Sequence, residues 1–137
     1  AVQTEIADKI NSDVWAVNHG VNCYPENIGD IQYKVDSAID KLGLCVIVAT
    51  PTLSYQGANA DGLVWGIDSL NVVASEIPAT NRARANYASA LSTAVRVAKV
   101  LKASGSCIPV SIVQTEINGV VIVTATLKAR YQFTDAD

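Results

Sequence analysis

Apolar residues recur with helical spacing in residues 75–103, the most informative part of this sequence. An extended apolar segment ends just before Pro78, and the spacing that follows predicts a long helix, Asn81–Ala103, whose N-cap is Thr80 or Asn81. One face of this helix carries Tyr87, Leu91, Ala94, Val95, Ala98 and Leu101. We therefore expect Leu91 to be buried and Ser92, one helical step of about 100° away, to be exposed.

Two shorter helices are predicted before it. Thr4–Trp15 carries apolar residues on one side at Ile6, Ile10 and Val14, and Val17–Asn27 is a connection rich in Asn and Gly. The second helix ends at Gly43, a typical helix terminator. Its apolar stripe consists of Ile28, Ile31, Val35, Ala38, Ile39 and Leu42.

Four extended segments complete the pattern. They are Leu44–Tyr55, Leu63–Ile77, Ile108–Ile117 and Val120–Phe133. Thr50-Pro51-Thr52 breaks or bulges the first segment, because proline cannot donate to a sheet ladder, and Gly66 marks a candidate bulge in the second. Asn118-Gly119 between the last two segments predicts a β-hairpin.

The element order is therefore α-α-β-β-α-β-β. Short loops between successive strands favour antiparallel pairing, so the sequence predicts an α+β fold with a four-stranded, mostly antiparallel sheet covered by helices on one face. Residues 1–137 form a single domain, in which 1–27 are an N-terminal helix and its connection. The tail Thr134–Asp137 is expected to be frayed.

Composition narrows the protein class. Half of the 137 residues are apolar, which is enough for a core, yet no apolar run reaches the roughly 18–20 residues that a membrane helix needs. No leader segment is recognisable, and the start at Ala1 is typical of a chain that lost its initiator Met, so we expect synthesis in a cytoplasm. Cys23, Cys45 and Cys107 are expected to be reduced, buried thiols.

Charge is distributed unevenly along the chain. Residues 1–76 hold ten acids and three bases, a net charge of −7, whereas residues 77–137 hold three acids and seven bases, a net charge of +4. No acid occurs between Ile77 and Thr115. Two interpretations remain open: a solvated helix face, or a subunit whose basic side meets the acidic side of a neighbour.

Catalytic chemistry is not indicated by any motif. The loop Gln56–Gly62 has glycines but lacks the Lys and Ser/Thr of a phosphate-binding loop, and His19 could act as a base but has no recognisable nucleophile beside it. His19 and the three cysteines have no metal-ligand spacing. The acidic balance argues against specific nucleic-acid binding. We expect no enzymatic activity, cofactor or metal.

Two stretches resemble the tail terminator (tail-completion) proteins of tailed bacteriophages. One is Glu76-Ile77-Pro78 followed by Asn81-Arg82, where a strand ending in Glu and Pro leads to an Asn-Arg pair that opens a helix; the other is the helix-to-strand segment Leu42–Pro51. The resemblance covers Ile28–Phe133. It implies a virion protein that forms a homo-hexameric ring, caps the tail tube and contacts the tail tube protein and a head-proximal connector protein, with DNA passing through the ring.

Two alternatives remain: another head–tail connector or neck component, and a non-viral intracellular binding module. If a ring forms, its subunit interface is a candidate site. We expect Arg82 and Arg84 on the basic side of that interface, and Asp61 and Asp68 on the acidic side.

Overall fold

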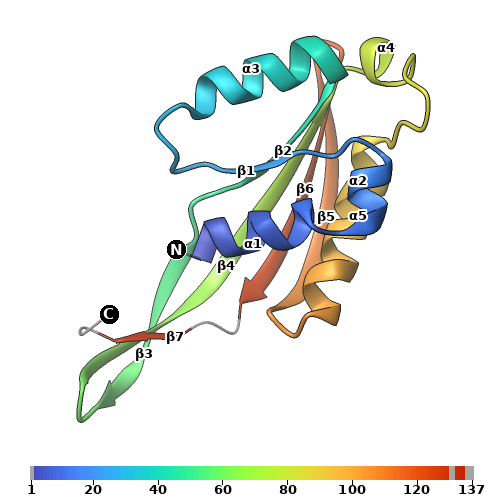
Figure 1. Cartoon of the computed structure of the whole chain (residues 1–137). Coiled ribbons are helices and arrows are strands. Elements are labelled where there is room, and N and C mark those ends of the chain that lie inside the picture. Colours follow the sequence, from blue (N-terminus) through green and yellow to red (C-terminus); the bar gives the residue numbers. More distant parts are fainter. Residues whose placement is uncertain (1, 130–131, 135–137) are drawn as a thin grey trace.

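The computed structural model describes residues 2–129 and 132–134 (Figure 1). Its elements follow the chain as α1 (Val2–Asn11), α2 (Val14–Asn18), β1 (Cys23–Pro25), α3 (Ile31–Leu42), β2 (Leu44–Val48), β3 (Thr52–Asn59), β4 (Gly62–Glu76), α4 (Pro78–Asn81), α5 (Ala90–Ala103), β5 (Cys107–Ile117), β6 (Val120–Ala129) and β7 (Gln132–Thr134).

The sheet is organised around β4. Five strands lie in the order β1-β2-β4-β6-β5, and β3 and β7 pair with the first half of β4. β1 and β2 are parallel, whereas the other pairs are antiparallel, so the sheet is mixed. The α+β class is confirmed. The predicted number of four strands is not matched: the break expected at Thr50-Pro51-Thr52 divides Leu44–Tyr55 into β2 and β3, the last predicted segment is described as β6 and β7, and β1 was not predicted.

The division at Pro51 produces a projecting hairpin. β2 pairs with the second half of β4 and β3 with the first half, so β3 continues along β4 where β2 ends, after a break at residues 49–51. We call residues 52–69 the arm; it extends away from the helices at the lower left of Figure 1. The register shifts place bulges at Asp68 on β4 and at Gln56 on β3, not at Gly66. The bulge at Asp68 is one source of the bend between arm and sheet.

Helices cover both faces of the sheet, which corrects the expectation of one face. α1 packs on β1 and β2, and α5 packs on β4, β5 and β6. The side chains of Tyr24 and Cys45 point to the other face, since each alternates with core residues along its strand. α3 lies there, with Lys34 Nζ 5.6 Å from the centre of the Tyr24 ring.

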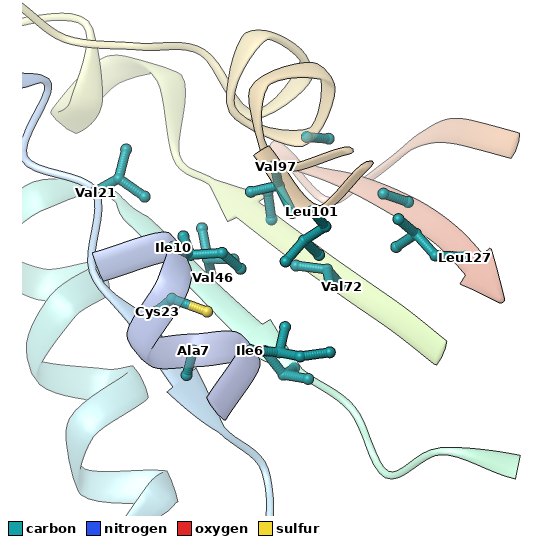
Figure 2. Close-up of a cluster of buried hydrophobic side chains, with 14 of the residues drawn as sticks. Ile6, Ala7, Ile10, Val21, Cys23, Val46, Val72, Val97, Leu101 and Leu127 are labelled. Atoms are coloured by element: carbon teal, nitrogen blue, oxygen red, sulfur yellow. The ribbon is translucent and has the colours of Figure 1, made fainter. Parts of the chain in front are cut away.

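The main core lies between the sheet and the α1–α5 layer. Figure 2 shows Ile6 and Ile10 of α1 beside Val46 of β2 and Leu101 of α5. Leu127 of β6 belongs to the same cluster. All three cysteines are buried, as expected.

The long helix begins later than predicted. α4 is a single turn that ends at Asn81, a loop follows, and α5 begins at Ala90. Its N-cap is Ser89, whose Oγ accepts a hydrogen bond from the Ser92 amide at 3.1 Å. The prediction of Thr80 or Asn81 as the N-cap is therefore wrong, because Ser89, further along the chain, caps the start of the helix.

The buried face of α5 also differs from the prediction. Ala94, Ala98 and Leu101 are buried as expected, but Leu91 is 45% exposed and Val95 52% exposed. The helix buries Ala90, Thr93 and Val97 in their place. The apolar side of this helix is wider than the sheet can cover, so Leu91 and Val95 remain at its margin.

The other helices deviate in smaller ways. Asp13 caps α2 through a hydrogen bond from the Ala16 amide, which ends α1 early and leaves Val14 exposed. On α3 only Ala38 of the predicted stripe is fully buried. None of the described helices is long and apolar enough to cross a membrane.

The closing hairpin is confirmed. Asn118 and Gly119 have φ values of 51° and 81°, which fits the two-residue turn with positive φ at both positions, and β6 alternates buried and partly buried residues. The predicted last strand is described as β6, which reaches Ala129, and β7; residues 130–131 between them lie outside the described part. Of the tail expected to be frayed, Thr134 pairs with Val64, and residues 135–137 lie outside the described part.

Candidate subunit interface

Glu76 connects the end of β4 to the start of α5. Its side chain is fully buried. Oε2 accepts hydrogen bonds from Asn81 Nδ2 at 2.7 Å and Arg82 Nε at 3.2 Å, and Oε1 accepts from the Ala90 amide at 3.1 Å. Asn81 Nδ2 also donates to the Ala88 carbonyl at 2.8 Å. The carboxylate therefore fixes both ends of the loop between α4 and α5.

The protonation of Glu76 follows from these contacts. Burial raises the pKa of the carboxyl, but the hydrogen bonds from Asn81, Ala90 and Arg82 outweigh burial and hold the pKa below its ordinary value. The side chain is thus an anion at neutral pH, matched by one adjacent guanidinium.

Arg82 and Arg84, the predicted basic side of an interface, both have partners within their own chain. Arg82 forms the ion pair with Glu76 and keeps half of its side chain exposed. Arg84 donates to the Leu42 carbonyl at 3.1 Å and to Asn81 Oδ1 at 2.7 Å, so it ties the end of α3 to α4. Their first role is therefore intramolecular.

Asp61 and Asp68, the predicted acidic side, both lie on the arm and are exposed. Asp61 is in the turn between β3 and β4, where its amide donates to Asn59 Oδ1 at 2.8 Å, and Asp68 is the bulged residue of β4. The structure brings the two acids onto one element and the two arginines into one cluster. It places the arm and α4 at opposite ends of the molecule (Figure 1).

A larger exposed apolar surface lies along β5, which sequence reasoning missed. β5 is an edge strand that pairs only with β6 among the described strands, and after Cys107 every residue of it is exposed. Leu91 and Val95 lie one turn apart on the flank of α5 opposite Arg96, whose guanidinium binds Asp13 beside α2. We call this set the β5 edge surface: Leu91, Val95, Ile108, Val110, Ile112, Val113 and Ile117.

A sequence signal for this surface existed. Apolar residues occur on both alternations of β5, whereas β6 keeps a single buried alternation. Pro109 within the run is typical of an edge strand. Natural edge strands are commonly protected by lysines or by covering elements, and β5 has no lysine.

The arm carries a second apolar surface. Leu53 is 46% and Tyr55 57% exposed, and the Tyr55 ring contacts the Trp65 ring edge-on at 5.8 Å between centres. Leu53 pairs with Ile67 and Tyr55 with Trp65, so these side chains share one face of the arm. We call Leu53, Tyr55 and Trp65 the arm surface.

Groups that could carry chemistry are sparse in the described part of the chain. His19 lies in an open depression with Trp15 and Arg82, and its Nδ1 is 2.8 Å from the Asn86 carbonyl oxygen. Among residues 2–129 no group of three or more His, Cys, Asp or Glu side chains could hold a metal ion. The exposed apolar surfaces are thus the more informative candidates for function.

Comparisons with known proteins add no family assignment: no protein-family model matches this chain, and a search of curated proteins gave no match.

Proposed function

We propose that this chain is a structural virion protein of tailed bacteriophages that assembles with its own copies into a ring, in the manner of a tail terminator. The ring, a hexamer by the family resemblance, caps the tail tube, contacts the tail tube protein on one side and a head-proximal connector protein on the other, and lets DNA pass without specific binding. No catalytic step or cofactor is part of this proposal.

The observation that carries the proposal is the pair of exposed apolar surfaces on different sides of one subunit. The β5 edge surface lies along β5 and α5, and the arm surface lies on the hairpin that projects away from them (Figure 1). Large exposed apolar patches mark interaction sites. Two different patches on separate sides suit a head-to-tail contact, which closes into a ring when the rotation permits.

The motif behind the resemblance also supports the proposal. Glu76, Asn81 and Arg82 form one hydrogen-bonded cluster, and Pro78 begins the helical turn between them. Because these residues bond to one another, their spacing in the sequence reflects a specific local structure, and the resemblance in this segment is more informative than a match of unconnected residues.

Sedimentation velocity and negative-stain electron microscopy of concentrated protein test the proposal. A closed ring with six times the mass of one chain is the expected particle. A species that stays monomeric or dimeric at all concentrations contradicts the ring and favours the intracellular binding module. A ring that attaches to the end of purified tail tubes distinguishes the terminator from another neck component.

A further inference from the structure

We infer that the arm of one copy docks on the β5 edge of the next copy, with β3 adding as a further strand beside β5. The inference rests on the proposed ring and specifies which surfaces make its contact. It commits to one occupant of the β5 edge surface, a second copy of this chain.

The backbone supports strand addition. β5 pairs only with β6, and β3 pairs only with β4, among the strands of residues 2–129 and 132–134. Each therefore has one side whose amide and carbonyl groups are not used by a neighbouring strand of the described chain. Such edges are templates for pairing with another chain. β3 has eight residues and the regular part of β5, after the bulge near Pro109, has seven, so the two edges match in length.

The side chains support the same contact. The face of the arm with Tyr55 continues the core-facing side of β4, since Ile67 on that face belongs to the core. When β3 extends the sheet past β5 with this face toward the helix layer, the arm surface comes to lie beside Ile112 and beneath Leu91 and Val95. The arm surface and the helix-side part of the β5 edge surface, Leu91, Val95 and Ile112, are then covered by one interaction.

Charge is complementary across this contact. Residues 42–81, which include the whole arm, contain no Lys or Arg, whereas residues 78–115, which include α5 and most of β5, contain no acid. Asp61 and Asp68 on the arm therefore approach a side that carries Lys102, exposed near the end of α5. Complementary potentials of this kind favour the correct encounter over contacts between like surfaces.

The geometry within one chain excludes self-docking. The arm leaves the sheet at the end of β4 remote from α4, and it points away from β5 and α5 (Figure 1). The contact is therefore intermolecular and heterologous, as a ring requires.

Photo-crosslinking tests the contact without knowledge of its register. The probe is p-benzoylphenylalanine in place of Tyr55, with the same substitution at Tyr33, exposed on α3, as the matched control. Equal amounts of ¹⁵N-labelled and unlabelled chains are mixed before illumination and digested with trypsin. We expect the Tyr55 probe to attach to peptide 103–128, which contains β5, with mixed isotope labels; the Tyr33 probe should not.

A backbone variant adds a second readout. In antiparallel pairing, hydrogen-bonded and non-hydrogen-bonded pairs alternate, and Ile117 and Val120 flank the two-residue turn as a hydrogen-bonded pair. The amide of Gln114 therefore points away from β6. Gln114→Pro removes one outward donor and should raise the concentration for half-maximal assembly about tenfold or more, whereas Gln114→Ala should leave it nearly unchanged.

The outcomes separate the two proposals. A parent protein that never assembles overturns the ring and the docking together. A parent that forms rings, but whose Tyr55 probe attaches only within its own chain or to peptides outside β5 and α5, overturns the docking alone. Equal assembly of Gln114→Pro and Gln114→Ala rings also overturns strand addition.

Discussion

The carboxylate of Glu76 offers the sharpest test of how the chain holds its fold, through the change Glu76→Gln. Glutamine has nearly the same shape but only one acceptor oxygen. In the parent, one carboxylate oxygen accepts from Asn81 and Arg82, and the other accepts from the Ala90 amide. The glutamine NH₂ must face one of these donors, so at least one buried donor loses its acceptor.

The expected loss of folding stability follows from the number of hydrogen-bond donors left without an acceptor. A buried donor left without a partner costs about 1–3 kcal/mol, and hydrogen bonds to a charged group contribute about 1.5–3 kcal/mol each. We expect a loss of about 2–4 kcal/mol, a large part of the about 5–15 kcal/mol that holds a typical domain together. With a urea m-value of about 2 kcal/mol/M, the middle of the usual range for small domains, the unfolding midpoint should fall by about 1–2 M.

Urea unfolding followed by circular dichroism measures this effect, and Glu5→Gln, at an exposed position of α1, is the matched control. The control should change stability by less than about 0.5 kcal/mol. The pH dependence has a definite sign. Because the pKa of Glu76 is lowered from 4.5, its charge stabilises the fold above the ordinary pKa, and this stabilisation is lost as pH falls through the lowered value.

The difference between parent and Glu76→Gln should therefore be full at pH 6 and shrink as the pH is lowered below about 4.5. A midpoint unchanged by the substitution, or a difference that stays constant down to the acid unfolding transition, would refute the assignment of Glu76 as a charged connector of β4, α4 and α5.

Three further substitutions test the helix assignments. Leu91→Asp should leave the monomer folded, whereas Ala94→Asp should unfold it, because Ala94 is 1% exposed and a buried unpaired carboxylate costs several kcal/mol. Thermal melts of both variants test this prediction. Equal stability of the two variants would contradict the assigned buried face of α5. Gly43→Ala should lower the free energy of unfolding by more than about 1 kcal/mol. Residue 43 has a φ of 70°, and the added Cβ would lie 2.6 Å from a backbone nitrogen of α4. An unchanged melting temperature would contradict this geometry.

The parts of the fold that the sequence predicted are those set by local pattern. The turn at Asn118-Gly119 needs only residues that accept positive φ, and Gly43 ends α3 for the same reason. The alternation of β6 identified its buried face correctly because that strand has a neighbour on each side and a helix over one face.

The parts that failed depend on contacts between distant residues. The Glu76 carboxylate accepts a hydrogen bond from the amide of Ala90, fourteen residues along the chain, and this contact fixes the start of the helix at Ser89. No local pattern in the sequence predicts such a contact. The periodicity of α5 is also ambiguous, since its apolar side spans more of the helix than one sheet covers. Only the placement of β5 at the edge reveals that Leu91 lies at the margin.

The same long-range contact explains why the motif and the candidate interface belong together. Glu76 holds the first residue of α5 at a fixed point above β4, and the Asp13–Arg96 ion pair, at 3.0 Å, holds the opposite flank of the helix against α2. Those two restraints set the rotation of α5 about its own axis. That rotation turns Leu91 and Val95 toward the β5 side.

In the proposed ring, Arg82 and Arg84 position the contact surface through their bonds within their own chain, and their direct contact with a neighbour's acids stays a prediction. Reversing the charge of Arg82 would place a carboxylate beside Glu76. Reversing the charge of Arg84 would remove the donor to the Leu42 carbonyl and to Asn81. Either change would disturb the subunit itself. Charge in the proposed contact is better attributed to the acids of the arm. These lie on a projecting hairpin, where substitution leaves the Glu76 cluster and the core intact.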